Sequence, residues 1–565
     1  MIHDRTAAAA PSPNPPPAPP PPPRKSSATV HLCAGVYLDE EFRNRVLRDV
    51  YHRPHRALAP NPGADAVPVV QHALRARRIT LVRAAVTLVL ALLALVIAPG
   101  SILAAIAILM VWQLVVSTAR LTVDAARYTR TGEGRPWRLA IRFVLTALLA
   151  AAAAFLLTAT GALALASGLE DASTASTQAP PSGGAEVSPV LWLVLLALIT
   201  VGFELGAVHL LKTVPDSAEP PAGHDPRLGR IAANRDPQVV NYAADRSPFV
   251  GSGTELATWQ FALPLRPKRG PAGDHDRPWP HFDTVSLSRH VKDAIAELAH
   301  DTSHSRHLPG LRLTDHVFVS GHDTVQPTHG VGELAASGYP HRSLQEVQND
   351  PTTPIRHYLR CQIVSWDGEL VTTVFMHTAL QGETLYLEFS SFMLPPTKAA
   401  YHAFGRESLG RTAAMAWGAV RSLVRLPAVT GRGIADLAAV AREGLRRRGQ
   451  SGAPQWAVRG SDDFGAEFGI RELGSDEDEH HYFQHRDVVK YTKILERQLL
   501  ATVVDYLSDK IDVAELTNRA ETIINAGVVN YGHLQAGAVG PGAAATVGAI
   551  GEGSGGTVRI TEGAT

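Results

Sequence analysis

Four long apolar stretches constrain this chain more than any other feature. They are residues 79–98, 101–119, 139–166 and 189–211. About 20 apolar helical residues, each rising about 1.5 Å, cross a hydrocarbon core of roughly 30 Å. Pro99 and Gly100 separate the first two stretches and predict a tight turn. Helices of soluble proteins seldom stay apolar on every face for this length, so the sequence predicts four transmembrane helices.

The positions of the arginines predict how these helices are oriented. The loop at residues 167–187 has three acidic residues and no basic one, whereas arginines precede the first stretch and fill the loop between the second and third. They are Arg75, Arg77, Arg78, Arg120, Arg127, Arg130, Arg135 and Arg138. Short loops rich in arginine stay on the cytoplasmic side. We therefore expect a multi-pass protein of the cell (inner) membrane with both termini in the cytoplasm.

Glu204 is the one acidic residue inside the fourth stretch, about 10 Å from its cytoplasmic end. A carboxylate at that depth costs roughly 2.5–3.5 kcal/mol, so it needs a partner or a proton. Arg83 and Arg142 lie near the cytoplasmic ends of the first and third stretches, and an arginine side chain reaches several ångströms. We favour a structural ion pair with one of them. The alternatives are an ion or proton path and a solvated helix end.

The chain before the first stretch is predicted to contain two parts. Residues 1–27 are rich in proline and cannot pack a core, so they form a spacer or a ligand for an aromatic groove. Residues 28–78 form a juxtamembrane segment. Within it we expect a strand over 29–37, a helix over 39–51 and a second helix that begins near Asp65. The second helix is predicted to run straight into the first span and to hold this segment close under the membrane.

The part after the last span is predicted to be a cytoplasmic α+β domain. Its clearest signal is three strand-like runs between residues 356 and 394, joined by Asp367-Gly368 and Gln381-Gly382. Asp-Gly favours a hairpin turn because both positions take positive φ. Further strands are expected at 239–244, 258–265 and 311–321, and helices at 288–300, 486–508 and 513–525. The predicted fold class is membrane α-helical with four spans, plus a cytoplasmic α+β domain with an antiparallel sheet and flanking helices.

Composition sets the remaining domain boundaries. The expected segments are a linker at 212–235, the α+β domain at 236–396, basic amphipathic helices at 397–450, an acidic loop at 451–481, a helical segment at 482–526 and a Gly/Ala-rich tail at 527–565. Residues 398–448 carry ten basic against three acidic side chains, and residues 462–479 carry eight acidic against one basic. The sign of the charge therefore reverses sharply between neighbouring segments.

The basic helices are candidates for binding anionic lipid headgroups. Anionic headgroups of the cytoplasmic leaflet attract such clusters at about 1 kcal/mol per basic residue, so the helices can lie flat on the bilayer while the acidic stretch competes for them. A self-neutralising soluble domain, with the apolar stripe as ordinary core, is the simpler alternative. The arginines concerned are Arg411, Arg421, Arg425, Arg446, Arg447 and Arg448.

The loop "PFVGSGTE" at residues 248–255 is a second candidate site. Gly251 and Gly253 can expose backbone N–H groups to an anion, with the hydroxyls of Ser252 and Thr254 assisting. The alternative, which we favour, is a tight connection between strands in which the glycines supply positive φ.

Motifs for other chemistry are absent from the sequence. It has no Walker A loop, Gly-x-Ser-x-Gly elbow, His-Glu-x-x-His helix or Cys-x-x-Cys pair. His304, His307, His316, His322 and Asp323 match no standard metal spacing. We therefore expect no catalytic residue, no metal ligand and no cofactor. The zero formal net charge of the chain gives no reason to expect nucleic acid as a partner.

Two quoted segments carry a family resemblance. The spans together with "RSPFVGSGTELATWQFALPL" and "IINAGVV…GHLQAGAVGPGA" resemble a set of uncharacterised multi-pass membrane proteins of actinobacteria. The likeness extends over most of the chain after Val30, and the Pro-Phe-Val-Gly-Ser-Gly run and Trp259 are its most specific part. The resemblance implies a source and a location, and it implies no mechanism.

The sequence leaves three functions open. The leading hypothesis is a non-catalytic membrane anchor or scaffold that presents its cytoplasmic domain to protein partners in the cytosol. The second is a small channel or transporter, formed as a homo-oligomer, for which Glu204 is the direct clue. The third is a membrane-tethered enzyme that binds an anionic ligand at residues 248–255.

Overall fold

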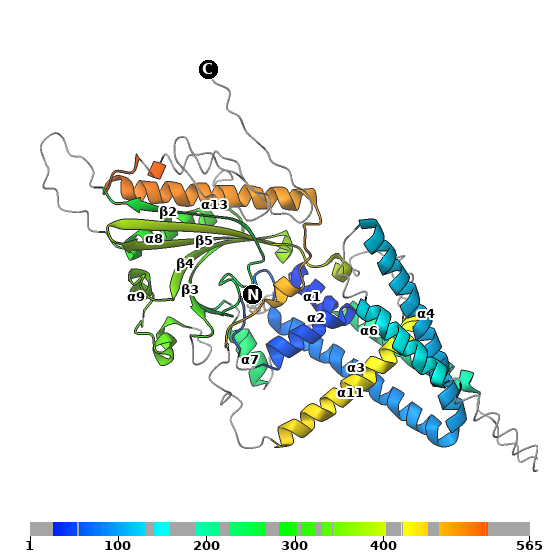
Figure 1. Cartoon of the computed structure of the whole chain (residues 1–565). Helices are drawn as coiled ribbons and strands as arrows, with labels where there is room; N and C mark the ends of the chain where they lie inside the picture. Colours follow the sequence, from blue (N-terminus) through cyan, green and yellow to red (C-terminus); the bar gives the residue numbers. More distant parts are fainter. Residues whose placement is uncertain are drawn as a thin grey trace, which may run out of the picture.

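The computed structural model separates a sheet domain from a group of long helices (Figure 1). Helices α3 (Ala66–Ile97), α4 (Pro99–Thr131) and α6 (Pro189–Thr213) lie at one end, and α1 (Ser27–Leu38) and α2 (Glu40–Arg45) lie between them and the sheet. Apart from single positions, the structure describes residues 26–53, 56–131, 140–156, 188–214, 225–266, 282–301, 307–323, 330–402, 422–449 and 463–517. The predicted Gly/Ala-rich tail and nearly all of the predicted proline-rich segment lie outside these residues.

A six-stranded sheet forms the centre of the sheet domain, in the order β1-β3-β4-β5-β6-β2. Its strands are β1 (Val239–Tyr242), β2 (Thr254–Pro264), β3 (Leu311–Ser320), β4 (Arg356–Ser365), β5 (Leu370–Gln381) and β6 (Thr384–Leu394). The predicted antiparallel meander is confirmed as β4-β5-β6. The sheet as a whole is mixed rather than antiparallel, because β1 pairs with β3 in parallel at its edge.

The two tight turns of the meander use residues with positive φ, as predicted, although one is displaced along the chain. Strands β4 and β5 are joined by the short 3₁₀ helix η3 (Trp366–Gly368), in which Asp367 has φ 53° and Gly368 has φ 87°. Strands β5 and β6 turn at Gly382 and Glu383, with φ of 56° and 55°. The second turn therefore lies one residue later than Gln381-Gly382.

Two helices, α8 (Thr284–His300) and α13 (Tyr482–Ser508), cover one face of the sheet, which we call the helical face. Apolar residues of both helices are fully buried against alternate strand residues, since successive side chains of a strand point to opposite faces. Examples are Val291, Leu495 and Leu499. Burial of each such side chain contributes roughly 1.5–3 kcal/mol, so this face holds the main core.

Both helices begin earlier than the sequence predicted. Helix α8 was expected from Ser288, but the Asp283 carboxylate accepts the Ser286 N–H at 2.7 Å and starts the helix at Thr284. A side-chain oxygen that accepts a free N–H of the first turn fixes a helix start. Helix α13 begins four residues before the predicted Arg486. The predicted helix at 513–525 lies mostly outside the described residues.

Three helices are long and apolar enough to cross a membrane. They are Ala66–Ile97, Pro99–Ala126 and Pro189–Leu211. They contain the first, second and fourth predicted spans nearly in full, and α4 begins at Pro99, where a turn was predicted. The described part of the third predicted span is the apolar helix Ala140–Leu156, and its remainder lies outside the described residues. The structure thus supports an association with membrane through three candidate spans.

Residues 29–37, predicted as a strand, instead form helix α1, which is capped by Ser26. Its apolar face, with Leu32, Cys33 and Val36, is buried against α3. A short apolar run does not by itself distinguish strand from helix, and burial of this face decides for the helix. The predicted helix at 39–51 is confirmed as α2 followed by the π-helix η1 (Val46–Tyr51).

The predicted linker at 212–235 contains helix α7 (Pro226–Ala233). Its Leu228 and Ile231 are buried with α1, α2, η1 and the first half of α3. We call these five elements the helical cluster. Helix α11 (Leu426–Gly449) lies beside α3 and α4 (Figure 1). The short elements are η2 (Val331–Ser337), α9 (Leu344–Asn349), η4 (Ala399–His402) and α12 (Ile470–Leu473).

Candidate functional site

A polar hollow of about 440 Å³ opens on the face of the sheet opposite α8 and α13. We call it the sheet hollow. Its lining comes from strand residues that alternate with core positions, which places their side chains on this face. They include Arg356, Tyr358, His377, Tyr386 and Glu388. The hollow thus combines a guanidinium, a carboxylate, an imidazole and two phenols.

The hydrogen bonds and pKa values of the hollow set the protonation states of its side chains. The Glu388 carboxylate accepts the hydroxyls of Tyr358 at 3.0 Å and Tyr386 at 3.2 Å. Burial, reinforced by Glu388, raises the pKa of Tyr386 to about 12 and that of Tyr358 still further. Burial lowers the pKa of His377 to about 4. At neutral pH the phenols therefore keep their protons and the imidazole is neutral.

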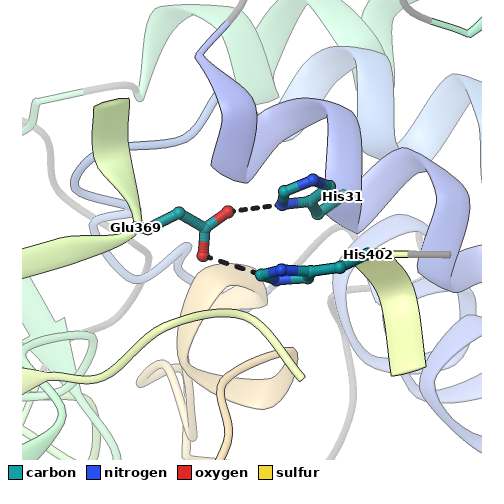
Figure 2. A group of neighbouring side chains, drawn as sticks. All are labelled: His31, Glu369 and His402. Carbon is teal, nitrogen blue, oxygen red and sulfur yellow. Dashed lines mark hydrogen bonds and ion pairs between the residues drawn. The ribbon is translucent and has the colours of Figure 1, made fainter. Parts of the chain in front are cut away.

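A second polar group, the junction cluster, lies where the helical cluster meets the sheet. It consists of His31 from α1, Glu369 just before β5 and His402 from η4 (Figure 2), together with Thr397 after β6. Nδ1 of His31 lies 2.6 Å from Oε1 of Glu369, and Nε2 of His402 lies 3.9 Å from Oε2. The two imidazole rings stack with centroids 3.9 Å apart.

The electrostatics of the junction cluster stabilise the Glu369 carboxylate beside the two stacked rings. Burial alone would raise the pKa of Glu369, but hydrogen bonds from His31 and the Thr397 amide, with the nearby charge of Arg471, lower it to about 2. Burial and the neighbouring His31 lower the pKa of His402. Arg471 is fully buried and donates to the carbonyl oxygens of Glu369 at 2.8 Å and Pro395 at 2.7 Å.

Sequence reasoning missed both groups. The members of the junction cluster are separated by up to 371 positions, between His31 and His402, and no local spacing joins them. The hollow residues alternate along β4, β5 and β6, so the meander itself carried a signal: Arg356 and Tyr358 share a parity, as do Tyr386 and Glu388. Polar residues on one face of a strand predict a face without apolar cover.

The comparisons with known proteins give one family match. A sequence model described as the AbeC-like domain matches residues 258–538, just under half of the chain. Searches of curated proteins and of solved structures found no match. The matched region runs from β2 past α13 and holds the whole sheet hollow, together with Glu369 and His402. It leaves out His31, the helical cluster and the candidate spans.

The structure brings two of the three predicted intramembrane ionisable residues together. Nη1 of Arg83 in α3 donates to Oε1 of Glu204 in α6 at 3.1 Å. Arg142 instead pairs with Asp124 of α4. The contact gives the Glu204 carboxylate the partner that a charged group inside a membrane requires.

The backbone amides of the glycine loop before β2 bind a carboxylate of the protein itself, that of Glu472. The Glu472 carboxylate accepts the N–H groups of Gly251 and Gly469, each at 3.1 Å. Burial raises the pKa of Glu472, and hydrogen bonds from the loop amides oppose this shift. A Cβ at Gly251 would lie 2.4 Å from the carbonyl oxygen of Pro60, and φ is +86°. The loop is therefore a tight connection, with Ser252 buried and Thr254 opening β2.

The predicted basic residues are only partly described. Arg411 and Arg421 lie outside the described residues, and Arg425 lies in the turn before α11. Arg446, Arg447 and Arg448 lie in the last turns of α11.

The segment predicted as an acidic loop, residues 451–481, contains the short helix α12 and is held by specific contacts where it is described. In its described part, Asp463 accepts the Ala244 N–H at 2.8 Å and Glu467 pairs with Arg56. The first contact ties the segment to the chain after β1, and the second ties it to the chain between η1 and α3.

The histidines singled out in the sequence do not gather into one group where they are described. His316 is buried in β3, with its Nε2 3.1 Å from the Thr314 hydroxyl, whereas His307 and His322 are exposed. His304 lies outside the described residues. Asp323 neighbours His322 at 4.0 Å.

Proposed function

We propose that the protein is a non-catalytic anchor of the cell (inner) membrane, with both termini in the cytoplasm, that presents its sheet domain to cytosolic partners. The observation that carries this proposal is the continuity of α3. One unbroken helix of 32 residues serves both as part of a buried core and as a candidate span.

The two halves of α3 differ in their surroundings. In the first half, Val67, Val70 and Ala73 are buried in the helical cluster. In the second half, Val89 and Val96 are 64% and 82% exposed, as expected for side chains that face lipid. An α-helix without a proline or glycine break is stiff over this length, so the position of the helical cluster follows the position of the span.

The helical cluster is in turn fastened to the sheet domain. The Ser27 N–H donates to the Asp367 carboxylate at 2.8 Å, in the turn between β4 and β5. The backbones of Gly63 and Gly368 approach so closely that a Cβ at Gly368 would lie 2.2 Å from the Gly63 carbonyl oxygen. A Cβ at Gly35 would likewise lie 2.7 Å from the Tyr401 ring. These contacts continue the rigid connection from membrane to sheet.

The position of helix α11 favours anionic lipid headgroups as a further partner of the protein. A Cβ at Gly433 would lie 3.0 Å from that of Ala84, within the apolar half of α3, and Trp112 of α4 donates to the Val424 carbonyl at 3.3 Å. Ile434 and Val440 stay exposed. A helix that packs at this depth, with exposed apolar residues and a basic end, suits the boundary between acyl chains and anionic headgroups.

The channel and enzyme hypotheses have weaker support. Glu204, the clue to a channel, already pairs with Arg83. The glycine loop, the candidate anion site, already binds the Glu472 carboxylate. Ion flux through liposomes that hold the full-length protein, beside Glu204→Gln and Arg83→Gln variants, checks the first point. We expect no flux in any of the three and a lower melting temperature in both variants. Flux that is present in the wild type and lost in Glu204→Gln would favour a channel.

Site-specific photo-crosslinking in living cells tests presentation to partners. A photoreactive residue at Gln381, on the rim of the sheet hollow, is compared with one at Asp509, an exposed position after α13. We expect discrete protein adducts from Gln381 and few from Asp509. The adducts should disappear when the sheet domain is detached from its spans. Equal adducts at both positions, or none at Gln381, would contradict presentation through the hollow.

A further inference from the structure

Four side chains of the junction cluster direct nitrogen and oxygen atoms at one point. The ligand atoms of His31, Glu369 and His402 lie within 4.8 Å of one another. The Thr397 hydroxyl oxygen lies among them, 2.8 Å from Nε2 of His402, 2.9 and 3.1 Å from the Glu369 oxygens and 3.5 Å from Nδ1 of His31. Figure 2 shows the Glu369 carboxylate facing both rings.

The spacing of these atoms is close to that of a tetrahedral metal site. Ligands bound at about 2.0–2.1 Å in a tetrahedron lie about 3.3 Å apart. The contacts that Glu369 and Thr397 make with each other and with the two imidazoles run from 2.6 Å, between His31 and Glu369, to 3.9 Å, between His402 and Glu369. All ligand atoms of His31, Glu369 and His402 lie within 4.8 Å of one another. Changes of about half an ångström or somewhat more in these separations bring the donors to metal-binding distances.

The donor types select a class of ion. Two imidazoles and one carboxylate suit Zn²⁺ and related divalent transition metals, whereas Ca²⁺ and Mg²⁺ prefer oxygen ligands alone. We propose that His31, Glu369 and His402 bind one divalent transition-metal ion, with Zn²⁺ the best match, and that the Thr397 hydroxyl lies at the fourth position.

The surroundings hold the ligands in place, as second-sphere contacts do in metal sites. The Thr397 N–H donates to Oε2 of Glu369 at 2.7 Å, and buried Arg471 holds the backbone carbonyl of Glu369. The Glu369 side chain is 8% exposed, while those of His31 and His402 are 21% and 32% exposed. An ion therefore reaches the ligands from the side of the two rings.

The ion has a structural role in this proposal. Its ligands come from α1, the start of β5 and η4, so it joins the helical cluster to the sheet. Because a metal that binds the folded state stabilises it by mass action, the melting temperature of the full chain should rise with the concentration of Zn²⁺. The proposal is independent of the identity of any cytosolic partner.

Metal binding by the purified, tag-free, full-length protein in detergent tests this inference. After chelation and dialysis, Zn²⁺ is titrated against a competing chelator, and Co²⁺ is added in parallel as a spectroscopic probe. We expect one Zn²⁺ per chain and the visible absorption of tetrahedral Co²⁺. His31→Ala and His402→Ala should weaken Zn²⁺ binding at least tenfold.

His480→Ala is the matched control, because its ring lies 5.3 Å from that of His402 yet its Nε2 pairs with Asp476 at 3.0 Å. It should bind Zn²⁺ as the wild type does. Equal loss in His480→Ala would overturn the assignment of the ligands. Absence of the Co²⁺ spectrum from the wild type, or Zn²⁺ binding no tighter than in the double His31→Ala, His402→Ala variant, would overturn the site itself, whether or not the variants fold.

Discussion

The two faces of the sheet are built from the same strands but differ in chemistry. On the helical face, Cys361 and Val374 are fully buried among aliphatic residues of α8 and α13. On the opposite face their neighbours Gln362 and Thr373 hydrogen-bond each other at 3.1 Å, and the hollow opens nearby. Apolar burial is non-directional and supplies most stability, whereas paired polar groups specify contacts. The core of the helical face is thus apolar, whereas the opposite face combines a smaller aromatic core around Phe249 with buried polar pairs and the open sheet hollow.

Truncation of the helical face should have the largest effect. Leu499→Ala removes a fully buried side chain between α13 and the sheet. We expect the free energy of unfolding to fall by about 2–5 kcal/mol, from lost burial and the cavity left behind. Denaturant unfolding, followed by tryptophan fluorescence to which Trp259 on the same face contributes, measures it. Val504→Ala, at a half-buried position on the same helix, should cost far less; equal costs would place the core elsewhere.

Removal of the buried guanidinium near the junction should have the next largest effect. Arg471→Met keeps most of the volume but leaves the carbonyl oxygens of Glu369 and Pro395 without their donor. Hydrogen bonds from charged groups are worth roughly 1.5–3 kcal/mol, so we expect a loss of that order. Hydrogen exchange should locate it at α12 and η4. An exposed control, Arg246→Met, should change little; similar effects for both would contradict a role for the buried network.

Acid should weaken a polar contact at the edge of the helical face. Asp315 of β3 accepts from Lys292 of α8 and lies 3.0 Å from Nε2 of His357. Burial would raise the pKa of Asp315, but these partners lower it to about 2. The unfolded chain therefore binds this proton at a higher pH than the folded chain. Stability is fully present above the unfolded pKa and is lost as pH falls from about 4 to 2, by roughly 1–2 kcal/mol.

Thermal melts between pH 5 and pH 2 check this dependence. In Asp315→Asn the contribution from this site should vanish, so the melting temperature should depend less steeply on pH below 4. An unchanged slope would show that other carboxyl groups dominate acid unfolding.

The smallest effect is expected in the sheet hollow. Tyr358→Phe removes one hydroxyl that donates to Glu388, while Tyr386 still donates to it. A single hydrogen bond contributes about 1 kcal/mol, so stability should fall by no more than that. Crosslinking from Gln381 should nevertheless weaken, because the polar surface has changed. Strong destabilisation with unaltered crosslinking would reverse the roles assigned to the two faces.

Local sequence patterns predict much of the fold. The meander followed from alternation and the turn at Asp367-Gly368, and three candidate spans followed from long apolar runs. Helix α3 was predicted to begin near Asp65, and the Asp65 carboxylate does cap it, accepting the Val67 N–H at 3.0 Å. Each of these signals lies within a few residues or one periodic run, where local propensity and pattern act directly.

The errors arose where distant contacts decide the outcome. The sequence of α1 has the pattern of a strand, and only the burial of its apolar face against α3 favours the helix. The junction cluster depends on tertiary contact between residues 31, 369 and 402. A single sequence contains no pattern that shows these distant residues to be neighbours. The glycine loop was correctly expected to be tight, but its internal anion, Glu472, lies 221 positions away from Gly251.

The most direct test of the account measures the distance from membrane to sheet. Spin labels are placed at Glu383, in the exposed turn between β5 and β6, and at Ile97, at the end of α3, in the full-length protein in lipid vesicles. The native cysteines, Cys33 and Cys361, are buried. Insertion of three glycines after Arg78 interrupts α3 between its two halves, and insertion of three alanines is the matched control because alanine keeps the helix continuous.

A rigid anchor predicts a narrow distance distribution in the wild type and in the alanine variant, and a broad one in the glycine variant. A wild-type distribution as broad as that of the glycine variant would contradict the central claim that α3 holds the sheet domain at a fixed position on the membrane.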